Sequence, residues 1–437
     1  MRTVMTDPEQ TQTGRSMAVR ATIASTCGSA VEWIDFTAYG AVSATVFPKI
    51  FFASMRGDAA VLASLGTFAV GFFARPLGGL LFGILGDRIG RKNILLYTLT
   101  LMGMASFLIG CLPSYATIGI AAPALLVVLR FLQGVALGGE STGAQLLTME
   151  HAPSDRRGLF GAFINIGNSL SAALANGVLF GLTVVLGTEQ FENWGWRIPF
   201  ISSLLLVVIG LYVRRHVAES PAFERAQAAV EVTKSSWLQM VRGQYRTILR
   251  LLVAWCGLTA SFYVITVYSL TYVVNTLGLP SRDVFLCLMA ANVIAVGIII
   301  GGGALSDRIG RKPVMLMSCI LGLVMAFAYF PMLNTANIWI IFLAMTLFLG
   351  VLQIQSGVQP AYFSEPFPTN VRYSGSALAY TGANLVAGGP TPFIAAWLLR
   401  WANGGTWVLT VFCMFVIGCS TLAYLTGPET RGTDLNR

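Results

Sequence analysis

The stretch GILGDRIGRK, residues 83–92, returns as GALSDRIGRK, residues 303–312. Asp87 and Asp307 lie 220 residues apart (307 − 87 = 220), which is about half of the 437-residue chain. A long apolar run enters each copy and another leaves it. One charged loop that occurs twice in a hydrophobic chain indicates a membrane protein built from two related halves, an arrangement typical of transporters.

The composition also indicates a membrane protein. Hydrophobic residues make up 55% of the chain and charged residues only 11%, whereas soluble domains carry about 25% charged residues. A spanning helix needs about 20 mostly apolar residues. A window of that length predicts spans over residues 21–47, 60–85, 93–112, 119–149, 158–186, 196–214, 248–276, 284–305, 313–332, 337–362, 373–400 and 406–426. We therefore expect an all-α integral membrane protein of about twelve transmembrane helices in two six-helix, pseudo-symmetric halves.

The polar intervals divide the chain into parts. The longest of them, residues 215–247, falls between the sixth and seventh spans, where a linker between two halves belongs. The predicted parts are a tail (1–20), a six-helix bundle (21–214), the linker (215–247), a second six-helix bundle (248–426) and a tail (427–437). Residues 1–20 are polar, so we expect no cleavable signal peptide.

The net charge of +9 is distributed unevenly along the chain. With the N-terminus inside and twelve crossings, most Lys and Arg fall on one side, in residues 1–20, 88–92, 156–157, 214–250, 308–312, 372 and 431–437. This positive-inside bias predicts a multi-pass inner-membrane protein with both termini in the cytoplasm. Basic loops also favour anionic lipid, so the charge requires no nucleic-acid partner.

Ionisable side chains within the spans are costly in lipid and mark functional sites. Glu32 and Asp35 share one helix face as residues i and i+3, at about the depth of Arg130, and we predict that these three residues couple transport to protons. Arg75 and Glu140 lie near a common depth and are predicted to form a structural pair, because an unpaired buried charge costs several kcal/mol. The alternative is that all five charges only brace the helices.

Polar and aromatic residues at mid-span are candidate substrate contacts. The three arginines within or at the edge of the spans, Arg75, Arg130 and Arg197, favour an anionic substrate, and Asn, Gln and Tyr can equally hold a carboxylate. For the aromatic residues, packing alone is the alternative. The predicted substrate-binding residues are Tyr39, Arg130, Gln133, Tyr263, Gln355 and Asn384.

The repeated loop is predicted to form a cytoplasmic gate. Its glycines permit tight turns and close helix approach, and its aspartates can bind arginines or the N-terminus of a neighbouring helix. The alternative is a topology anchor made of basic loops. The predicted gate residues are Gly83, Asp87, Arg88, Gly90 and Arg91 in the first copy, and Asp307, Arg308, Gly310 and Arg311 in the second.

Other classes of protein receive little support. The seven cysteines form no CxxC pair, and the chain has only two histidines, so we expect no metal site and no disulfide framework. An enzyme embedded in the membrane would need a His, metal or nucleophile cluster, and a receptor would need an output domain longer than either tail. We expect neither, and no cofactor beyond the proton gradient.

At this point the sequence resembles the major facilitator superfamily, whose cytoplasmic loop signature is similar to both copies of the repeat. More narrowly, it resembles the metabolite:proton symporters, whose members carry shikimate, 2-oxoglutarate, citrate, aromatic acids, or proline and betaine. The similar segments are VEWIDFTAYG (31–40), FFARPLGGLLFGILGDRIGRK (72–92), RFLQGVALGGESTGAQLLTMEHAPSDRRG (130–158), WGWRIPF (194–200), RRHVAESPAF (214–223) and YFSEPFPTNVRYSG (362–375).

The resemblance implies a major facilitator fold and proton-coupled uptake of a small organic acid by alternating access. It matches Glu32 and Asp35 to an acidic first helix implicated in proton coupling, and Arg130 to a fourth-helix arginine implicated in coupling or substrate binding. Glu365 and Arg372 match a loop of the second half, where SEPFP departs from the usual Leu after the glutamate.

Two readings of the substrate and direction stay open beside the organic acid. The first is uptake of a zwitterionic osmolyte of the proline or betaine type, although the long C-terminal coiled coil of the osmosensing members is not seen. The second is efflux. In every case we expect a monomer whose partners are the small-molecule substrate, the proton and membrane lipid.

Overall fold

The computed structural model describes residues 33–89, 91–138, 149, 152–153, 155–216, 237–369 and 371–433. Within these ranges the chain folds into α- and π-helices without any strand. The first half contains a helix over residues 33–45 and then α2 (Phe47–Ile50), α3 (Gly57–Ile89), α4 (Arg91–Cys111), α5 (Tyr115–Ile118), α6 (Ala121–Gly138), α8 (Arg157–Leu186), α9 (Thr188–Gln190), η1 (Phe191–Gly195) and α10 (Arg197–His216). The second half contains α12 (Trp237–Tyr263), η2 (Val264–Tyr268), α13 (Ser269–Thr271), η3 (Tyr272–Thr276), α14 (Ser281–Ile309), α15 (Arg311–Leu333), α16 (Ile338–Ser364), α17 (Arg372–Ala383), η4 (Asn384–Gly388), α18 (Pro390–Trp401) and α19 (Trp407–Leu425).

These helices coincide with the twelve predicted spans as far as the described residues reach. Eight of them are long and apolar enough to cross a membrane by length and composition. Large apolar side chains such as Leu205, Val324 and Phe415 are more than 60% exposed, which suits a surface that faces lipid rather than water. The predicted all-α membrane fold is therefore confirmed.

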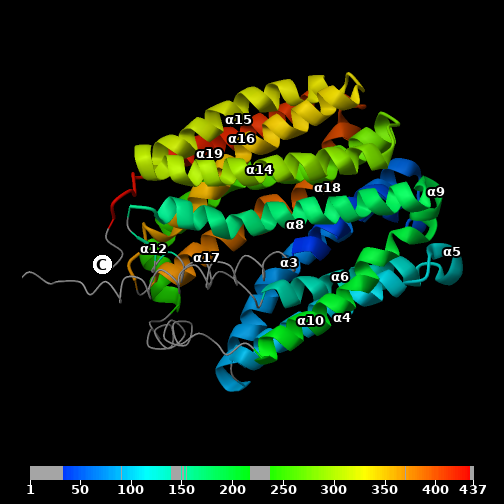
Figure 1. Cartoon of the computed structure of the whole chain (residues 1–437), viewed down its shortest axis with the longest axis horizontal. Coiled ribbons are helices and arrows are strands. Elements are labelled where there is room, and N and C mark those ends of the chain that lie inside the picture. The colour runs from blue at the N-terminus through cyan, green and yellow to red at the C-terminus, as the bar shows by residue number, and fades with distance from the viewer. Residues whose placement is uncertain are drawn as a thin grey trace, which may run out of the picture.

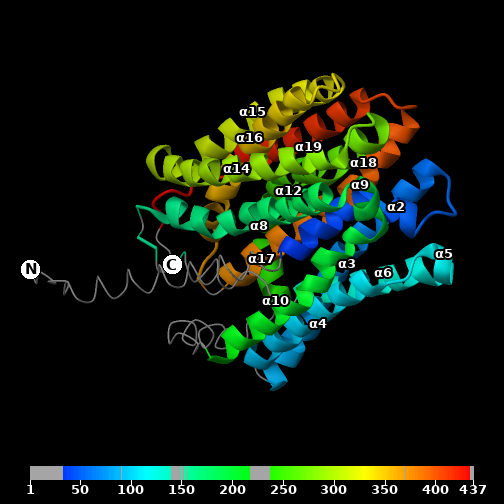
Figure 2. The ribbon, with the colours of Figure 1, turned by 45° about the vertical axis from the view of Figure 1, so that its right-hand side comes forward.

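The long helices run side by side in two groups (Figures 1 and 2). The helices α3, α4, α6 and α10 form one group, and α14, α15, α16 and α19 form the other. Helix α8 belongs to the first half of the chain, yet it packs along α14 and α16 of the second. The two halves therefore meet along a seam that α8 and α14 share.

The seam between α8 and α14 depends on small residues. A Cβ atom placed on Gly303 would lie 2.5 Å from the Gly158 carbonyl oxygen, closer than real contacts allow. Glycine at both positions lets the two backbones touch. The second seam joins α3 to η4 and α18.

The bundle has two ends that differ in charge. We call the end that carries the N-terminus of α8, the α14–α15 turn and residues 427–433 the basic end, and the opposite end with α2, α5 and α9 the far end (Figure 1). Gly310 forms the α14–α15 turn with φ of +107°, a conformation that favours glycine. Helix α12 begins at Trp237, inside the predicted linker, so the polar interval contributes the first turns of a long helix.

Candidate substrate and proton site

Arg130 on α6 is a charged residue of the first half whose side chain is fully shielded from solvent. Gly71 on α3 makes room for it, since a Cβ atom at Gly71 would lie only 2.7 Å from Arg130 Nε. A larger residue at that position would push the guanidinium away. The glycine of one helix thus positions the arginine of the next.

The described part of the chain satisfies Arg130 only partly. Its Nη1 donates to Gln133 Oε1 at 2.6 Å, whereas Nε and Nη2 have no hydrogen-bond partner among the described residues. Its Cζ atom lies 3.9 Å from the ring centre of Tyr39 and 4.3 Å from that of Phe36. Aromatic faces attract the cation but accept little from its N–H groups. Because an unsatisfied buried charge is costly, this guanidinium is suited to an anionic ligand.

Asp35 lies on the helix over residues 33–45 and is 5% exposed. Its Oδ1 accepts a hydrogen bond from Ser203 Oγ on α10 at 2.6 Å. Asp35 and Arg130 form no direct ion pair. Arg130 bonds Gln133 instead, and Gln133 Nε2 donates to Ser106 Oγ at 2.7 Å.

An aromatic cluster connects this site to the second half. The Phe72 ring of α3 lies 5.4 Å from that of Tyr263 on α12, and the Phe68 ring lies 5.6 Å from it. The Arg75 guanidinium lies over Phe72 at 4.5 Å and over Phe36 at 4.7 Å. Two arginines therefore approach the same group of aromatic rings, at the interface between the halves.

The structure brings most of the predicted substrate contacts together. Tyr39, Arg130, Gln133 and Tyr263 belong to the cluster just described, and the Tyr39 hydroxyl also bonds Thr67 Oγ1 at 2.7 Å. Asn384 lies in η4, which packs against α3, and its Nδ2 donates to the Tyr380 carbonyl at 2.9 Å.

Gln355 lies apart from the cluster, in the core of the second half. Its Nε2 donates to Ser318 Oγ at 3.1 Å, and its Oε1 accepts from the Tyr424 hydroxyl at 3.2 Å. These partners come from α15 and α19. The side chain is therefore engaged among helices of its own half.

Two predicted residues cannot be placed, because Glu32 and Glu140 lie outside the described residues. The predicted pair between Arg75 and Glu140 therefore stays a prediction. The hydroxyls of Ser106 and Ser203 were not singled out from the sequence. Serine is frequent in apolar spans, so its residue type alone gave no signal.

The second copy of the repeated loop holds the two halves together at the basic end. Asp307 accepts the backbone N–H of Gly158 at 2.9 Å and that of Leu159 at 2.8 Å, at the N-terminus of α8. Four backbone N–H groups at a helix start lack helical partners, and a carboxylate there is favoured by the helix dipole. Asp307 thus joins the second half to the first.

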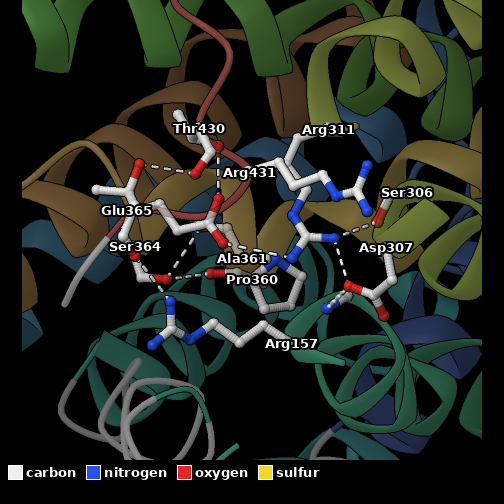
Figure 3. Close-up of polar contacts among 12 residues, drawn as sticks. Arg157, Ser306, Asp307, Arg311, Pro360, Ala361, Ser364, Glu365, Thr430 and Arg431 are labelled. Carbon is white, nitrogen blue, oxygen red and sulfur yellow. Dashed lines mark hydrogen bonds and ion pairs between the residues drawn. The ribbon is translucent and has the colours of Figure 1, made fainter. Parts of the chain in front are cut away.

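Arg311 continues this contact on its other side (Figure 3). It is 1% exposed, and its Nη1 donates to Asp307 Oδ1 at 2.5 Å and to Ser306 Oγ at 2.9 Å. Its Nη2 reaches Glu365 Oε1 at 3.4 Å, and Glu365 accepts from the Thr430 hydroxyl at 2.5 Å. The result is a buried charged network that links α14, α15, α16 and the end of the chain.

Other gate residues lie beside this network or outside it. Arg308 accepts through its backbone carbonyl from Arg431 Nη1 at 2.6 Å. In the first copy, Gly83, Asp87 and Arg88 fall within α3 and Arg91 begins α4. Their side chains and the whole of Gly90 lie outside the described part of the chain.

A backbone carbonyl joins the two halves at the far end. Pro48 follows Ala44 by four positions and has no N–H, so the Ala44 carbonyl has no partner within its helix. Thr271 Oγ1 donates to it at 3.2 Å and Asn275 Nδ2 at 3.3 Å. Both donors come from the second half. This contact therefore connects the halves at the end opposite to Asp307.

Comparison with known proteins agrees with this geometry. A family model described as Major Facilitator Superfamily matches residues 28–390. The chain is 39% identical over 436 residues to the inner membrane metabolite transport protein YhjE of Escherichia coli, with 98% of each chain covered. It is 36% identical over 431 residues to the shikimate transporter of Escherichia coli, with 95% of each covered. It is also 36% identical over 390 residues to the proline/betaine transporter of Salmonella typhimurium, covering 87% of this chain and 78% of that one.

A solved structure has the same fold. The proton:xylose symporter XylE bound to 6-bromo-6-deoxy-D-glucose superposes with a TM-score of 0.74 at 19% identity, over 97% of this chain and 98% of that one. Two helical halves with a charged site buried near their interface define an integral membrane transporter. The chain belongs to the Major Facilitator Superfamily, whose proteins are transporters and not enzymes.

Proposed function

We propose that the protein takes up a small organic acid together with protons, by alternating access across the inner membrane. The observation that carries the proposal is the buried Arg130 guanidinium, whose Nε and Nη2 have no hydrogen-bond partner among the residues that the structure describes. A carboxylate fits two parallel N–H donors of an arginine. Tyr39, Gln133, Tyr263 and Asn384 are the proposed neighbours of the bound substrate.

Asp35 is the proposed proton site. It is buried and accepts the hydroxyl of Ser203, yet it has no direct ion pair with Arg130. An anion bound to Arg130 weakens the attraction between that guanidinium and Asp35, so the carboxylate then binds a proton more readily. Glu32, one turn earlier, is the second candidate.

Transport is proposed to rock the halves, residues 21–214 and 248–426, about the central site. The Ala44 contact closes the far end and the Asp307 contact closes part of the basic end. Opening toward either side must break one of them. We propose that the basic end faces the cytoplasm together with both termini, because basic loops stay on that side, and that the protein works as a monomer in contact with anionic lipid.

A zwitterionic osmolyte is the second candidate, since the names of some relatives include proline and betaine. A quaternary ammonium would bind to aromatic faces. Here the faces of Phe36 and Tyr39 already carry the Arg130 guanidinium. That observation favours the organic acid.

The test is uptake by the purified protein in proteoliposomes. The labelled panel contains shikimate, 2-oxoglutarate, citrate and benzoate as acids, and proline and glycine betaine as zwitterions. We expect at least one acid to accumulate when an inward proton gradient is imposed, and a protonophore to abolish its accumulation.

Matched vesicles separate the alternatives. Vesicles that contain Arg130→Gln serve as the negative control. Uptake that follows a sodium gradient and ignores pH would contradict proton coupling. Accumulation of the zwitterions alone would mean that the substrate is an osmolyte and not an organic acid. Loss of preloaded substrate from the vesicles when the gradient is imposed would indicate efflux.

A further inference from the structure

The guanidinium of Arg130 has two kinds of donor. Nη1 is taken, because it donates to Gln133 Oε1 at 2.6 Å. Nε and Nη2 have no hydrogen-bond partner within the part of the chain that the structure describes. These two nitrogens lie side by side on one edge of the planar group, and such an edge fits both oxygens of a carboxylate. The donors without a partner therefore form a single bidentate edge.

The surroundings of this edge leave it uncovered. A Cβ atom at Gly71 on α3 would lie 2.7 Å from Nε and 3.3 Å from Nη2, so glycine at that position keeps a side chain away from both nitrogens. The ring centres of Phe36, Tyr39 and Phe68 lie 4.3, 3.9 and 5.2 Å from Cζ. Rings attract the cation, but they do not replace the two hydrogen bonds that a carboxylate would accept.

Gln133 has both ends of its side-chain amide engaged. Oε1 accepts from Arg130, and Nε2 donates to Ser106 Oγ on α4 at 2.7 Å. An amide donates only through its nitrogen and accepts only through its oxygen, so the bond to Ser106 fixes which end faces the arginine. Gln133 and Ser106 are fully buried, and no bulk water competes for these bonds. The pair thus holds the guanidinium in one orientation.

We propose that Arg130 binds one carboxylate of the substrate through its Nε–Nη2 edge, and that Gln133 and Ser106 are positioning residues that hold this edge in place. The inference rests on the proposed function and narrows the substrate class to acids with one carboxylate and a ring-shaped or apolar body. Gln133 and Ser106 act through Arg130. A group that is held before the ligand arrives loses less freedom on binding, which favours affinity.

The selectivity for one carboxylate follows from the donors that are already used. With Nη1 bound to Gln133, the edge formed by Nη1 and Nη2 is closed to a second acceptor. Arg75 lies over Phe36 and Phe72 and has further interactions of its own. A second carboxylate would lie among aromatic rings, where an unpaired charge is costly. Those same rings suit an unsaturated or aromatic body.

The experiment measures dissociation constants by titration calorimetry on the purified protein. Benzoate and shikimate offer one carboxylate, 2-oxoglutarate offers two and citrate three. The carboxamide of the tighter monocarboxylate is the neutral control. We expect the wild type to bind a monocarboxylate at least about tenfold more tightly than 2-oxoglutarate, citrate or the carboxamide, a factor that one hydrogen bond to a charged group supplies.

The variants test the positioning role through the ratio of two dissociation constants, that of 2-oxoglutarate to that of the monocarboxylate. Gln133→Leu releases Nη1 and lets the guanidinium turn. The monocarboxylate should then bind about tenfold more weakly, while 2-oxoglutarate loses less because it can use the released donor. The ratio should fall toward one. Ser106→Ala should lower it by a smaller factor, and Ser106→Thr, which keeps the hydroxyl, should restore it.

Gln353→Leu is the matched control. It removes a buried amide of the same kind, but this amide donates to Ser169 at the seam between the halves and not to a serine beside the arginine. The ratio of dissociation constants should therefore keep its wild-type value.

The outcomes separate the inference from the function on which it rests. If the wild type binds none of the acids, the proposed function and the inference both fall. If the wild type binds 2-oxoglutarate or citrate as tightly as the monocarboxylates, the inference alone is overturned. An unchanged ratio in Gln133→Leu also overturns it, and an equal weakening of all ligands in that variant would make Gln133 a purely structural residue. If Gln133→Leu does not fold, an unchanged ratio in Ser106→Ala, or one that Ser106→Thr fails to restore, overturns the positioning role.

Discussion

Gln133 and Gln353 lie 220 residues apart (353 − 133 = 220), which is the offset of the repeated loop, yet the two halves use them differently. Gln133 joins the charge of Arg130 to Ser106 within the first half. Gln353 instead donates to Ser169 Oγ on α8 at 3.0 Å, so it binds the second half to the first. One repeat uses the amide for a charged site, and the other uses it at a seam.

At the same offset, the other polar residues of the first-half site have apolar counterparts in the second half. Positions 35, 106, 130 and 203 correspond to Trp255, Ala326, Gly350 and Ala423. Duplication therefore preserved the helices and the loop, whose requirements are set by lipid and by packing. Among the described residues, Asp35 and Arg130 are buried charges of the first half, whereas the second half has its buried charges, Arg311 and Glu365, in the network at the basic end. This asymmetry concentrates the proposed chemistry on one face of the interface and leaves the other to aromatic and amide groups.

The largest expected effect concerns Arg130. Arg130→Gln keeps a polar side chain but removes the charge and the donors Nε and Nη2, which have no partner among the described residues. Each hydrogen bond to a charged group is worth about 1.5–3 kcal/mol, so we expect binding of the accumulated acid to weaken by about a hundredfold or more. Gln353→Leu should bind normally. Equal losses in both variants would show that the two halves share the binding site.

The next effect separates accumulation from exchange. Asp35→Asn retains the shape and the hydrogen bond from Ser203 but cannot exchange a proton at neutral pH. We expect counterflow of labelled substrate to persist while accumulation against a gradient stops. Undiminished accumulation in Asp35→Asn would show that Asp35 does not carry the transported proton. Glu32 would then be the proton site, and Glu32→Gln is the variant that tests it.

A smaller effect is expected at the basic end, where Asp307 contacts the N-terminus of α8. Asp307→Asn weakens charge-assisted contacts of about 1.5–3 kcal/mol, a shift that changes a two-state ratio by roughly ten- to a hundredfold. Single cysteines placed near the basic end should react faster with a thiol reagent, and those near Ala44 more slowly.

Asp87→Asn, in the first copy of the loop, is the matched variant. If both substitutions shift labelling alike, the two loops act as equivalent gates. Unchanged labelling at both ends, together with reduced transport, would assign the loop to folding or insertion instead.

The sequence predicted both the fold and much of the basic-end network, because apolar spans and the charged residues at their ends form patterns that can be recognised in the sequence. Lipid demands apolar spans of fixed length, and charged residues that recur at the span ends are easily seen in such a chain. Asp307 and Arg311 stood out by repetition, and Glu365 by its resemblance to a family segment. The structure puts these three residues in one network.

The site was harder to predict because depth does not decide which face of a helix a residue occupies. Gln353 and Gln355 differ by two positions and therefore lie on different faces of α16. One reaches Ser169 of the first half, and the other reaches Ser318 in its own half. The serines of the site, Ser106 and Ser203, were equally inconspicuous, since most hydroxyls in these helices bond a carbonyl one turn back, as those of Ser171 and Thr183 do.

Gln355, in the core of the second half, should contribute to stability but not to substrate binding. Gln355→Leu leaves the hydroxyls of Ser318 and Tyr424 without this partner. A buried polar group that loses its partner costs about 1–3 kcal/mol. We expect a lower Tm in detergent and an unchanged dissociation constant for the accumulated acid. A change in affinity without a change in Tm would indicate that Gln355 contributes to the substrate site after all.

The smallest effect concerns Glu365 at the basic end. Burial raises the pKa of its carboxyl above the ordinary value, and the Arg311 charge and the Thr430 hydroxyl oppose that rise only in part. The folded protein therefore holds this proton at pH values at which the unfolded chain has released it. The contribution of Glu365 to stability is complete below its unfolded pKa and is lost as the pH rises through the folded pKa.

Glu365→Gln imitates the protonated form at every pH. The Tm of this variant, relative to that of the wild type, should therefore rise by a few degrees between about pH 4.5 and pH 8. Thr430→Val serves as the control, because it removes a hydrogen bond from the same network but no titrating group. A relative Tm of Glu365→Gln that falls with increasing pH would mean that the ion pair with Arg311 outweighs the cost of burying the charge, and that the network is held together by its charges rather than by its packing.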